Sequence, residues 1–129
     1  MDRLTAVSAQ ASEATTAPAS APLLDLRHLD HQTLGDASLR RIVLNLFLDE
    51  APQYAANLRA AADRKAWRMA VHTLKGVALN IGAFPLAWQC KDYEALDVQT
   101  GTIDQQAAVD AIASLIDGTV ATIRTTLRA

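Results

Sequence analysis

The chain has 129 residues, half of them hydrophobic, and a formal net charge of −2 at pH 7. This length suits one domain around one core and leaves no room for a second domain. The small net charge gives no global reason to expect binding to nucleic acid or to a membrane surface. Only 5 Gly and 4 Pro occur among many Ala and Leu residues, which favours packed helices over a sheet.

Residues 1–21 are rich in Ala, Ser and Thr, with only a weak apolar cluster near the start. Such a segment buries too little apolar surface to offset the entropy lost on ordering, so we expect a flexible N-terminal leader. It lacks the apolar stretch of a secretory signal, and no other apolar run approaches the ~20 residues that span a bilayer. The single cysteine, Cys90, is expected in the core. These features favour a cytoplasmic protein.

Residues 22–129 are expected to form the folded domain. A short helix is predicted over residues 25–32, with Leu26 and Leu29 facing inward. Asp36 then offers an N-cap for a long helix. The apolar positions that repeat along this helix are Leu39, Ile42, Val43, Leu46, Phe47, Tyr54 and Leu58. Pro52 interrupts the pattern, so we expect a kink, or a division into two helices, near residues 49–51.

Asp63 is predicted to cap the next helix, which carries His72 and stops near Gly82. Pro85 suits the first turn of the helix that follows, and this helix is expected to fade by residues 97–101. Its inward-facing residues are predicted to be Leu86, Cys90 and Tyr93.

Thr102 followed by Gln105 resembles a capping box at the start of a last helix. The apolar stripe of this helix comprises Val109, Ile112, Ile116, Val120, Ile123 and Leu127. Gly118 lies within the helix but should not end it. Four long amphipathic segments joined by short connections predict an all-α protein: an antiparallel up-and-down four-helix bundle with a short additional N-terminal helix.

The helix around His72 carries the most informative pattern. At ~100° per residue, one face presents His72, Lys75, Gly76 and Leu79. The opposite face holds Trp67, Ala70, Leu74, Ala78 and Ile81, so the histidine is expected to point outward. A glycine inside a helix costs ~1 kcal/mol relative to alanine, and close approach of a partner would offset this penalty.

Basic residues surround this histidine in a slightly acidic protein. Between residues 59 and 75 the cations are Arg59, Arg64, Lys65, Arg68 and Lys75, and the single acid is Asp63. A partner with an acidic site would be steered to this region.

The run His72-Thr73-Leu74-Lys75-Gly76, followed by Gly82-Ala83 and then by Leu86, Cys90 and Glu94 at helical spacing, resembles the signature of histidine phosphotransfer (HPt) domains. The order of helices resembles the family over about residues 23–128. In that family a histidine accepts a phosphoryl group from an aspartyl phosphate on a receiver domain and passes it to another receiver. The resemblance implies that His72 is the phosphoacceptor, that Lys75 neighbours the phosphoryl oxygens, and that Gly76 is the gap at which the receiver docks.

Histidine suits such a relay, because a neutral ring nitrogen is nucleophilic near pH 7 and its bond to phosphorus stays reactive. In the loose transition state, charge spreads over the phosphoryl oxygens. Lys75 is expected to stabilise this charge, and Arg68, one turn on the other side of His72, offers a second cation. Lys65 and Arg68 are predicted to form a basic flank for the partner, and Leu79 an apolar contact. No acid cluster with metal-ligand spacing accompanies His72, so any Mg²⁺ is expected on the receiver and no cofactor on this chain.

The expected function is therefore that of a monomeric phosphocarrier without its own ATP-binding kinase domain. It is expected to act between receiver domains or between a hybrid sensor kinase and a response regulator. One alternative is the dimerising phosphoacceptor domain of a sensor kinase, which would require adjoining ATP-binding motifs. A second is a non-catalytic helical adaptor that binds a partner through the His72/Leu79 face. His28 and His31, three residues apart, have a spacing compatible with zinc but lack a third ligand nearby.

Overall fold

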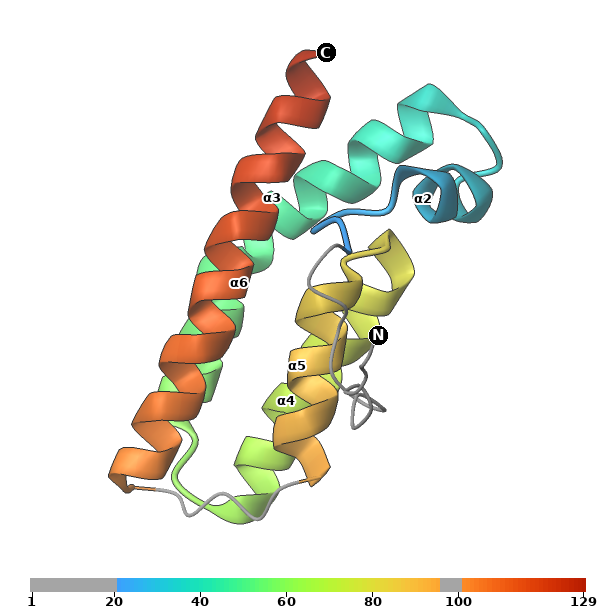
Figure 1. Ribbon diagram of the computed structural model, residues 1–129. Coiled ribbons are helices and arrows are strands. Elements are labelled where there is room, and N and C mark those ends of the chain that lie inside the picture. The colour runs from blue at the N-terminus through green and yellow to red at the C-terminus, as the bar shows by residue number, and fades with distance from the viewer. Residues whose placement is uncertain (1–20, 96–100) are drawn as a thin grey trace, which may run out of the picture.

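The computed structural model describes residues 21–95 and 101–129 (Figure 1). Within these ranges the chain forms five helices and no strand, which confirms the all-α prediction. The helices are α2 (Leu26–Gln32), α3 (Ala37–Ala60), α4 (Arg64–Ile81), α5 (Phe84–Ala95) and α6 (Ile103–Arg128). Residues 1–20, most of the predicted leader, lie outside the described part, as do residues 96–100 of the connection before α6.

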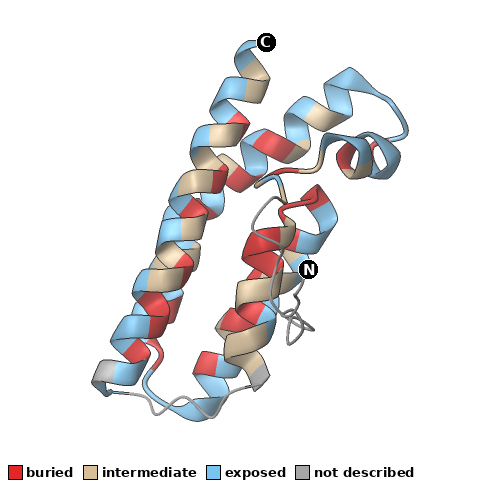
Figure 2. Ribbon diagram, in the orientation of Figure 1, coloured by how far each residue is buried: buried red, intermediate tan, exposed pale blue. Residues whose placement is uncertain are grey.

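Each of the four long helices packs against two of the others. α3 packs against α4 and α6, and α5 packs against the same two helices, while α2 contacts α4. Figure 1 shows α6 beside the second half of α3, and α4 beside α5. Buried residues gather where these helices face one another (Figure 2). The short links after α3 and α4 reverse the chain direction, as in the predicted up-and-down bundle.

The first half of α3 departs from the predicted core. Figure 1 shows this segment crossing the end of the bundle at a steep angle to α6. Leu39, Ile42 and Leu46, which were expected inside, are exposed, and so is Leu26 of α2. Of the predicted apolar positions of α3, Phe47 and Leu58 are buried and Val43 and Tyr54 are partly buried, while Leu44 and Ala51 are buried in addition. The periodicity identified a helix correctly, but several apolar residues of this segment lie on the side away from the described core.

Pro52 does not divide α3. The helix runs without interruption from Ala37 to Ala60 with Pro52 inside it, so the predicted division into two helices is wrong. Figure 1 shows that α3 changes direction along its length, which agrees with the alternative of a kink. Proline lacks the N–H that would bond to the preceding turn, and its ring crowds that turn, so the helix bends there without ending.

The predicted caps of the other long helices are present. The Asp63 carboxylate accepts a hydrogen bond of 2.8 Å from the Ala66 N–H at the start of α4. The Thr102 hydroxyl accepts from the Gln105 N–H at the start of α6. The Gln105 amide makes a second connection that the pattern did not predict, because its Nε2 donates to the carbonyls of Leu58 and Ala61 at 3.1 and 2.9 Å. This buried side chain ties the end of α3 to the start of α6.

Gly82 ends α4 in the left-handed conformation, with φ of 84°. Its carbonyl accepts a 2.8 Å bond from the Asp25 N–H, which fixes the segment before α2 on the end of α4. A Cβ at residue 82 would lie 2.8 Å from the Asp25 carbonyl oxygen, closer than atoms tolerate. The end of α4 therefore needs glycine for two reasons, the positive φ and the approach of Asp25.

We expect Gly82→Ala to lower the free energy of unfolding by about 2–3 kcal/mol, since it combines left-handed strain with a backbone clash. Gly101→Ala is the matched control, because Gly101 has φ of 77° but open space around its Cβ position. The control should lose only the strain term, about 1 kcal/mol. Urea denaturation measures both values, and equal losses would show that the Asp25 contact contributes nothing.

α6 is, by length and composition, apolar enough to cross a membrane over Asp104–Arg128. The expectation that no segment approaches this length is therefore wrong for α6. In the fold, however, α6 packs against α3 and α5. Its buried residues include Val109, Ile112, Ile116 and Ile123 at helical spacing, and Asp110 and Asp117 are exposed. This is the pattern of an amphipathic core helix.

Candidate functional site

His72 lies near the middle of α4 with its side chain in solvent. The buried residues of this helix are Trp67, Val71, Leu74, Ala78 and Ile81. Because these apolar side chains anchor one face of α4 in the core, His72 is held on the other, and its side chain is 69% exposed. The predicted outward orientation of the histidine is confirmed.

The imidazole of His72 is oriented by Glu94, a residue of α5. Its Nδ1 lies 2.9 Å from Glu94 Oε2. The other carboxylate oxygen, Oε1, accepts a hydrogen bond from Lys75 Nζ. One carboxylate thus connects the histidine and the lysine that lies one turn further along α4.

The surroundings of Glu94 favour its ionised form. The hydrogen bond from Lys75 is the largest influence and lowers the pKa of Glu94, burial opposes this, and the hydrogen bond from His72 adds to the lowering. An ionised carboxylate can only accept, so His72 Nδ1 carries the proton in this contact. Since the pKa of Glu94 is lower in the folded chain than in the unfolded one, the pair stabilises the fold above the unfolded pKa and loses this effect as pH falls through the folded pKa.

Lys75 is less exposed than its place on the outward face of α4 suggests. Its side chain is 23% exposed and forms an ion pair with Glu94. The ammonium also lies close enough to Cys90 to lower the pKa of that thiol, although burial dominates and raises it to about 12. Cys90 is a buried core residue, as predicted. The ammonium of Lys75 is therefore held on the α5 side of His72.

A groove of about 740 Å³ lies beside the histidine. It is lined by Arg64, Lys65, Arg68, Met69, His72 and Glu94. The structure thus brings the predicted basic residues Lys65 and Arg68 to one surface with the histidine. Leu79, predicted as an apolar contact for the partner, is 42% exposed but does not line this groove.

Gly76 opens the surface next to His72. A Cβ built at this residue meets no atom within 4 Å, so nothing in the described chain requires the missing side chain. Its helical φ does not require glycine either. Among the described residues, therefore, no contact explains a glycine in the middle of α4, and the surface at this residue is open.

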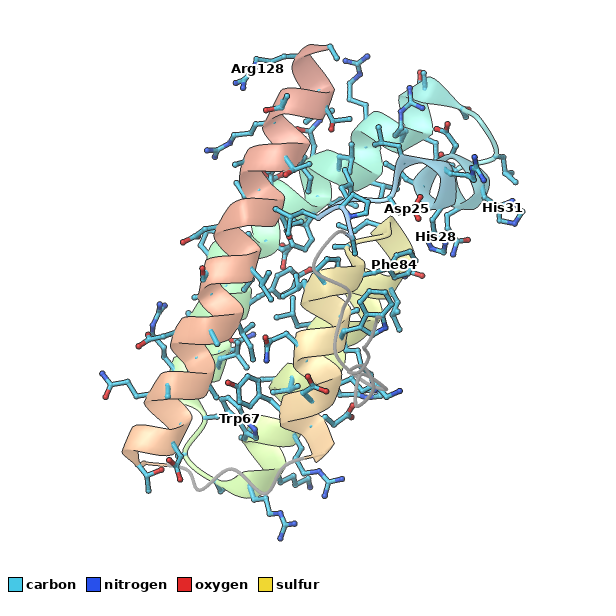
Figure 3. All side chains as sticks on the ribbon, viewed as in Figure 1. Asp25, His28, His31, Trp67, Phe84 and Arg128 are labelled. Carbon is cyan, nitrogen blue, oxygen red and sulfur yellow. The ribbon has the colours of Figure 1, made fainter. Side chains whose placement is uncertain are left out.

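His28 and His31 are not joined by a third potential metal ligand from the part of the chain that the structure describes. The described residues contain no group of three or more His, Cys, Asp or Glu that could hold a metal ion. His28 Nε2 instead lies 2.8 Å from the Leu79 carbonyl oxygen, and its ring meets Phe84 edge to face at 5.0 Å (Figure 3). His28 therefore docks α2 against the end of α4.

Two residues of the site were absent from the sequence-based predictions of function. Glu94 was part of the recognised motif but received no role, because its partners lie 19 and 22 residues away along the chain. Met69 was not considered, although it is 62% exposed and lines the groove beside His72. The sequence signal for Met69 was its position: a large apolar residue three positions before the histidine lies on the same outward face of the helix.

Comparison with known proteins agrees with this geometry. No curated protein and no solved structure matches the chain. The family model of the Hpt domain matches residues 42–126, which include most of α3 and all of α4 and α5, with His72, Lys75, Gly76 and Glu94 among them. On this match over most of its length, the chain belongs to the Hpt domain family, whose members act in histidine phosphotransfer.

Proposed function

We propose that His72 accepts a phosphoryl group from the aspartyl phosphate of a receiver domain and passes it to another receiver. The observation that carries this proposal is the arrangement of the imidazole. Nδ1 donates to Glu94, while no described residue hydrogen-bonds to Nε2. The neutral ring therefore presents the Nε2 lone pair to solvent, in the tautomer that a nucleophile needs.

In the transfer step, the Nε2 lone pair attacks phosphorus while the bond from phosphorus to the aspartyl oxygen breaks and its electrons return to the carboxylate. The ring keeps its Nδ1 proton and becomes cationic. Glu94 faces this charge across the 2.9 Å contact. The reverse step onto a second receiver uses the same atoms. Lys75 lies one turn from His72, where its cation can stabilise charge on the phosphoryl oxygens.

Partner and cofactor expectations belong to the same proposal. The acyl phosphate and its Mg²⁺ reside on the receiver, so this chain holds neither metal nor other cofactor and does not act as a kinase. The lysine and arginine of the groove, Lys65 and Arg68, favour an acidic partner site. We also propose that the protein is cytoplasmic and monomeric. Cell fractionation tests its location, and the molar mass in solution tests its oligomeric state.

The test is phosphotransfer from receiver domains that have been phosphorylated with acetyl phosphate and Mg²⁺. Label should move to this protein, map to His72, and be acid-labile and base-stable, as for a bond between phosphorus and nitrogen. Acetyl phosphate without a receiver is the control and should give no label. Stable binding of receivers without transfer would favour the adaptor alternative.

Glu94 is predicted to be a positioning residue for His72. Glu94→Ala should slow phosphotransfer about 10- to 100-fold, by analogy with the loss seen when the partner that orients a metal-bound imidazole is removed. Glu94→Gln retains an acceptor for Nδ1 but loses the charge, so it should recover part of the rate. Imidazole ¹⁵N chemical shifts should show the Nδ1–H tautomer in the wild type and a mixture in Glu94→Ala. An unchanged tautomer would contradict the positioning role.

Lys75→Met should shorten the lifetime of phosphorylated His72 or slow its formation, because the cation beside the phosphoryl oxygens is lost. Methionine keeps most of the apolar stem of the lysine. Lys75→Arg is the matched control, since it retains the charge and a donor for Glu94. The decay of labelled protein and the transfer rate in both directions measure the effect. Wild-type kinetics for Lys75→Met would reduce Lys75 to a structural partner of Glu94.

A further inference from the structure

The groove beside His72 is bordered by cations, but Lys75 is not among them. Its lining residues are Arg64, Lys65, Arg68, Met69, His72 and Glu94. The ammonium of Lys75 instead forms an ion pair with Glu94. Arg68 is exposed and lies one helical turn before His72. The cations that border the space beside the imidazole therefore come from the first two turns of α4.

The imidazole directs Nε2 away from the pair of Lys75 and Glu94. Its Nδ1 lies 2.9 Å from Glu94. Because the two nitrogens lie on different edges of the ring, a group bound to Nε2 points away from that carboxylate. Helical side chains lean toward the N-terminus of their helix, so the ring of His72 is expected over the preceding turn, to which Arg68 belongs. A phosphoryl group on Nε2 is thereby placed toward Arg68.

The charges around a phosphorylated His72 do not balance without a further cation. The phosphoryl group carries close to two negative charges at neutral pH, and the ring that keeps its Nδ1 proton carries one positive charge. Lys75 and Glu94 contribute one charge of each sign, and the hydrogen bond from Lys75 keeps the pKa of Glu94 low, so that carboxylate stays ionised. The sum of these charges is about −1, which one more cation would neutralise.

Arg68 can supply this charge without breaking a contact. It makes no hydrogen bond or ion pair within the part of the chain that the structure describes. Lys75, by contrast, is bonded to Glu94. Residues four apart on a helix have Cβ atoms about 6 Å from each other, so the long arginine side chain can reach a group on His72. Its planar guanidinium can donate two parallel hydrogen bonds to phosphoryl oxygens.

We propose that Arg68 binds the phosphoryl oxygens of phosphorylated His72 and so stabilises the phosphorylated form of this chain. This inference rests on the proposed function. It gives Arg68 a role that needs no bound receiver, whereas a basic flank acts only while the partner approaches or is bound. Because the guanidinium stabilises the phosphorylated protein itself, Arg68 would shift the equilibrium of transfer toward His72.

The distribution of label at equilibrium separates this role from one in docking. The protein is mixed with a receiver domain that has been phosphorylated with acetyl phosphate and Mg²⁺ and then freed of acetyl phosphate, at concentrations where little complex remains. A residue that acts only in docking changes how fast label exchanges, but not the final ratio of phosphorylated His72 to phosphorylated receiver. Arg68→Gln should lower this ratio about threefold or more, the effect of losing an exposed ion pair. Arg68→Lys keeps a cation and should give an intermediate ratio.

Lys65→Gln is the matched control. Lys65 lines the same groove, but it lies about 10 Å from His72 along the helix axis, where salt screens most of its charge. This variant should leave the ratio within about 1.5-fold of the wild type. Equal decreases in Lys65→Gln and Arg68→Gln would contradict a specific contact from Arg68.

The pKa of the phosphoryl group provides a second readout. A cation beside the phosphoryl oxygens favours the dianion, so ³¹P NMR titration of the purified phosphorylated protein should show a higher phosphoryl pKa in Arg68→Gln than in the wild type. An unchanged equilibrium ratio and an unchanged phosphoryl pKa in Arg68→Gln would overturn the inference and leave the proposed function intact. Absence of label on wild-type His72 would instead defeat the proposed function, and the inference with it. Thermal unfolding of each variant shows whether the fold is retained.

Discussion

His72→Gln is expected to abolish phosphorylation completely while leaving the fold intact. Glutamine has no nucleophilic ring nitrogen, so no bond to phosphorus can form. The side chain of His72 is 69% exposed and lies opposite the buried face of α4, so its removal should change the free energy of unfolding by less than about 0.5 kcal/mol. Transfer of ³²P from a phosphorylated receiver measures the first effect, and urea denaturation measures the second.

His28→Gln is the control for this variant, because it changes another histidine that lies outside the groove at His72. It should keep full labelling. Its stability should fall instead, since His28 contacts the Leu79 carbonyl and the ring of Phe84. Label that persists on His72→Gln, or that maps to His28 or His31, would contradict the assignment of the phosphoacceptor.

Gly76→Gln is expected to move stability and activity in opposite directions. Glutamine is the better helix former by roughly 0.5 kcal/mol, and the site is open, so the isolated protein should become slightly more stable. The new side chain would stand beside His72 and hold the receiver away. Because displacement of reacting groups by about 1 Å costs about 100-fold in rate, transfer should fall at least that far.

Gly76→Ala completes this series. A single methyl group also removes the helix penalty, by up to about 1 kcal/mol, but it intrudes less. We expect intermediate transfer rates at a stability at least equal to that of Gly76→Gln. Thermal unfolding and transfer kinetics on the same samples provide both values. Wild-type transfer by Gly76→Gln would show that no partner surface comes close to this residue.

These variants address different parts of one mechanism. His72 and Glu94 concern the nucleophile and its tautomer, whereas Gly76 concerns the distance between the two reacting groups. Variants of all three should be slow even at saturating receiver concentration, whereas a defect that high receiver concentration overcomes would indicate weaker binding alone.

Local sequence signals determined most of the helices. The carboxylates of Asp36 and Asp63 and the hydroxyl of Thr102 cap α3, α4 and α6 as predicted, because capping depends on backbone groups two or three residues away. Gly82 ends α4 for an equally local reason, its positive φ. The motif around His72 likewise predicted the family, and the outward phase of the histidine followed from its spacing to the buried residues of α4.

Tertiary structure decided the features that depend on which surfaces meet. Periodicity could not show that Leu39, Ile42 and Leu46 face away from the described core, because apolar residues lie on more than one side of α3. Nor could it pair Glu94 with His72 and Lys75, since that contact requires α5 to lie beside α4. The sequence by itself thus determined the N-caps of α3, α4 and α6, the end of α4 at Gly82, and which histidine faces outward. Only their packing decided how that imidazole is oriented and which groove adjoins it, because both depend on residues far apart in the chain.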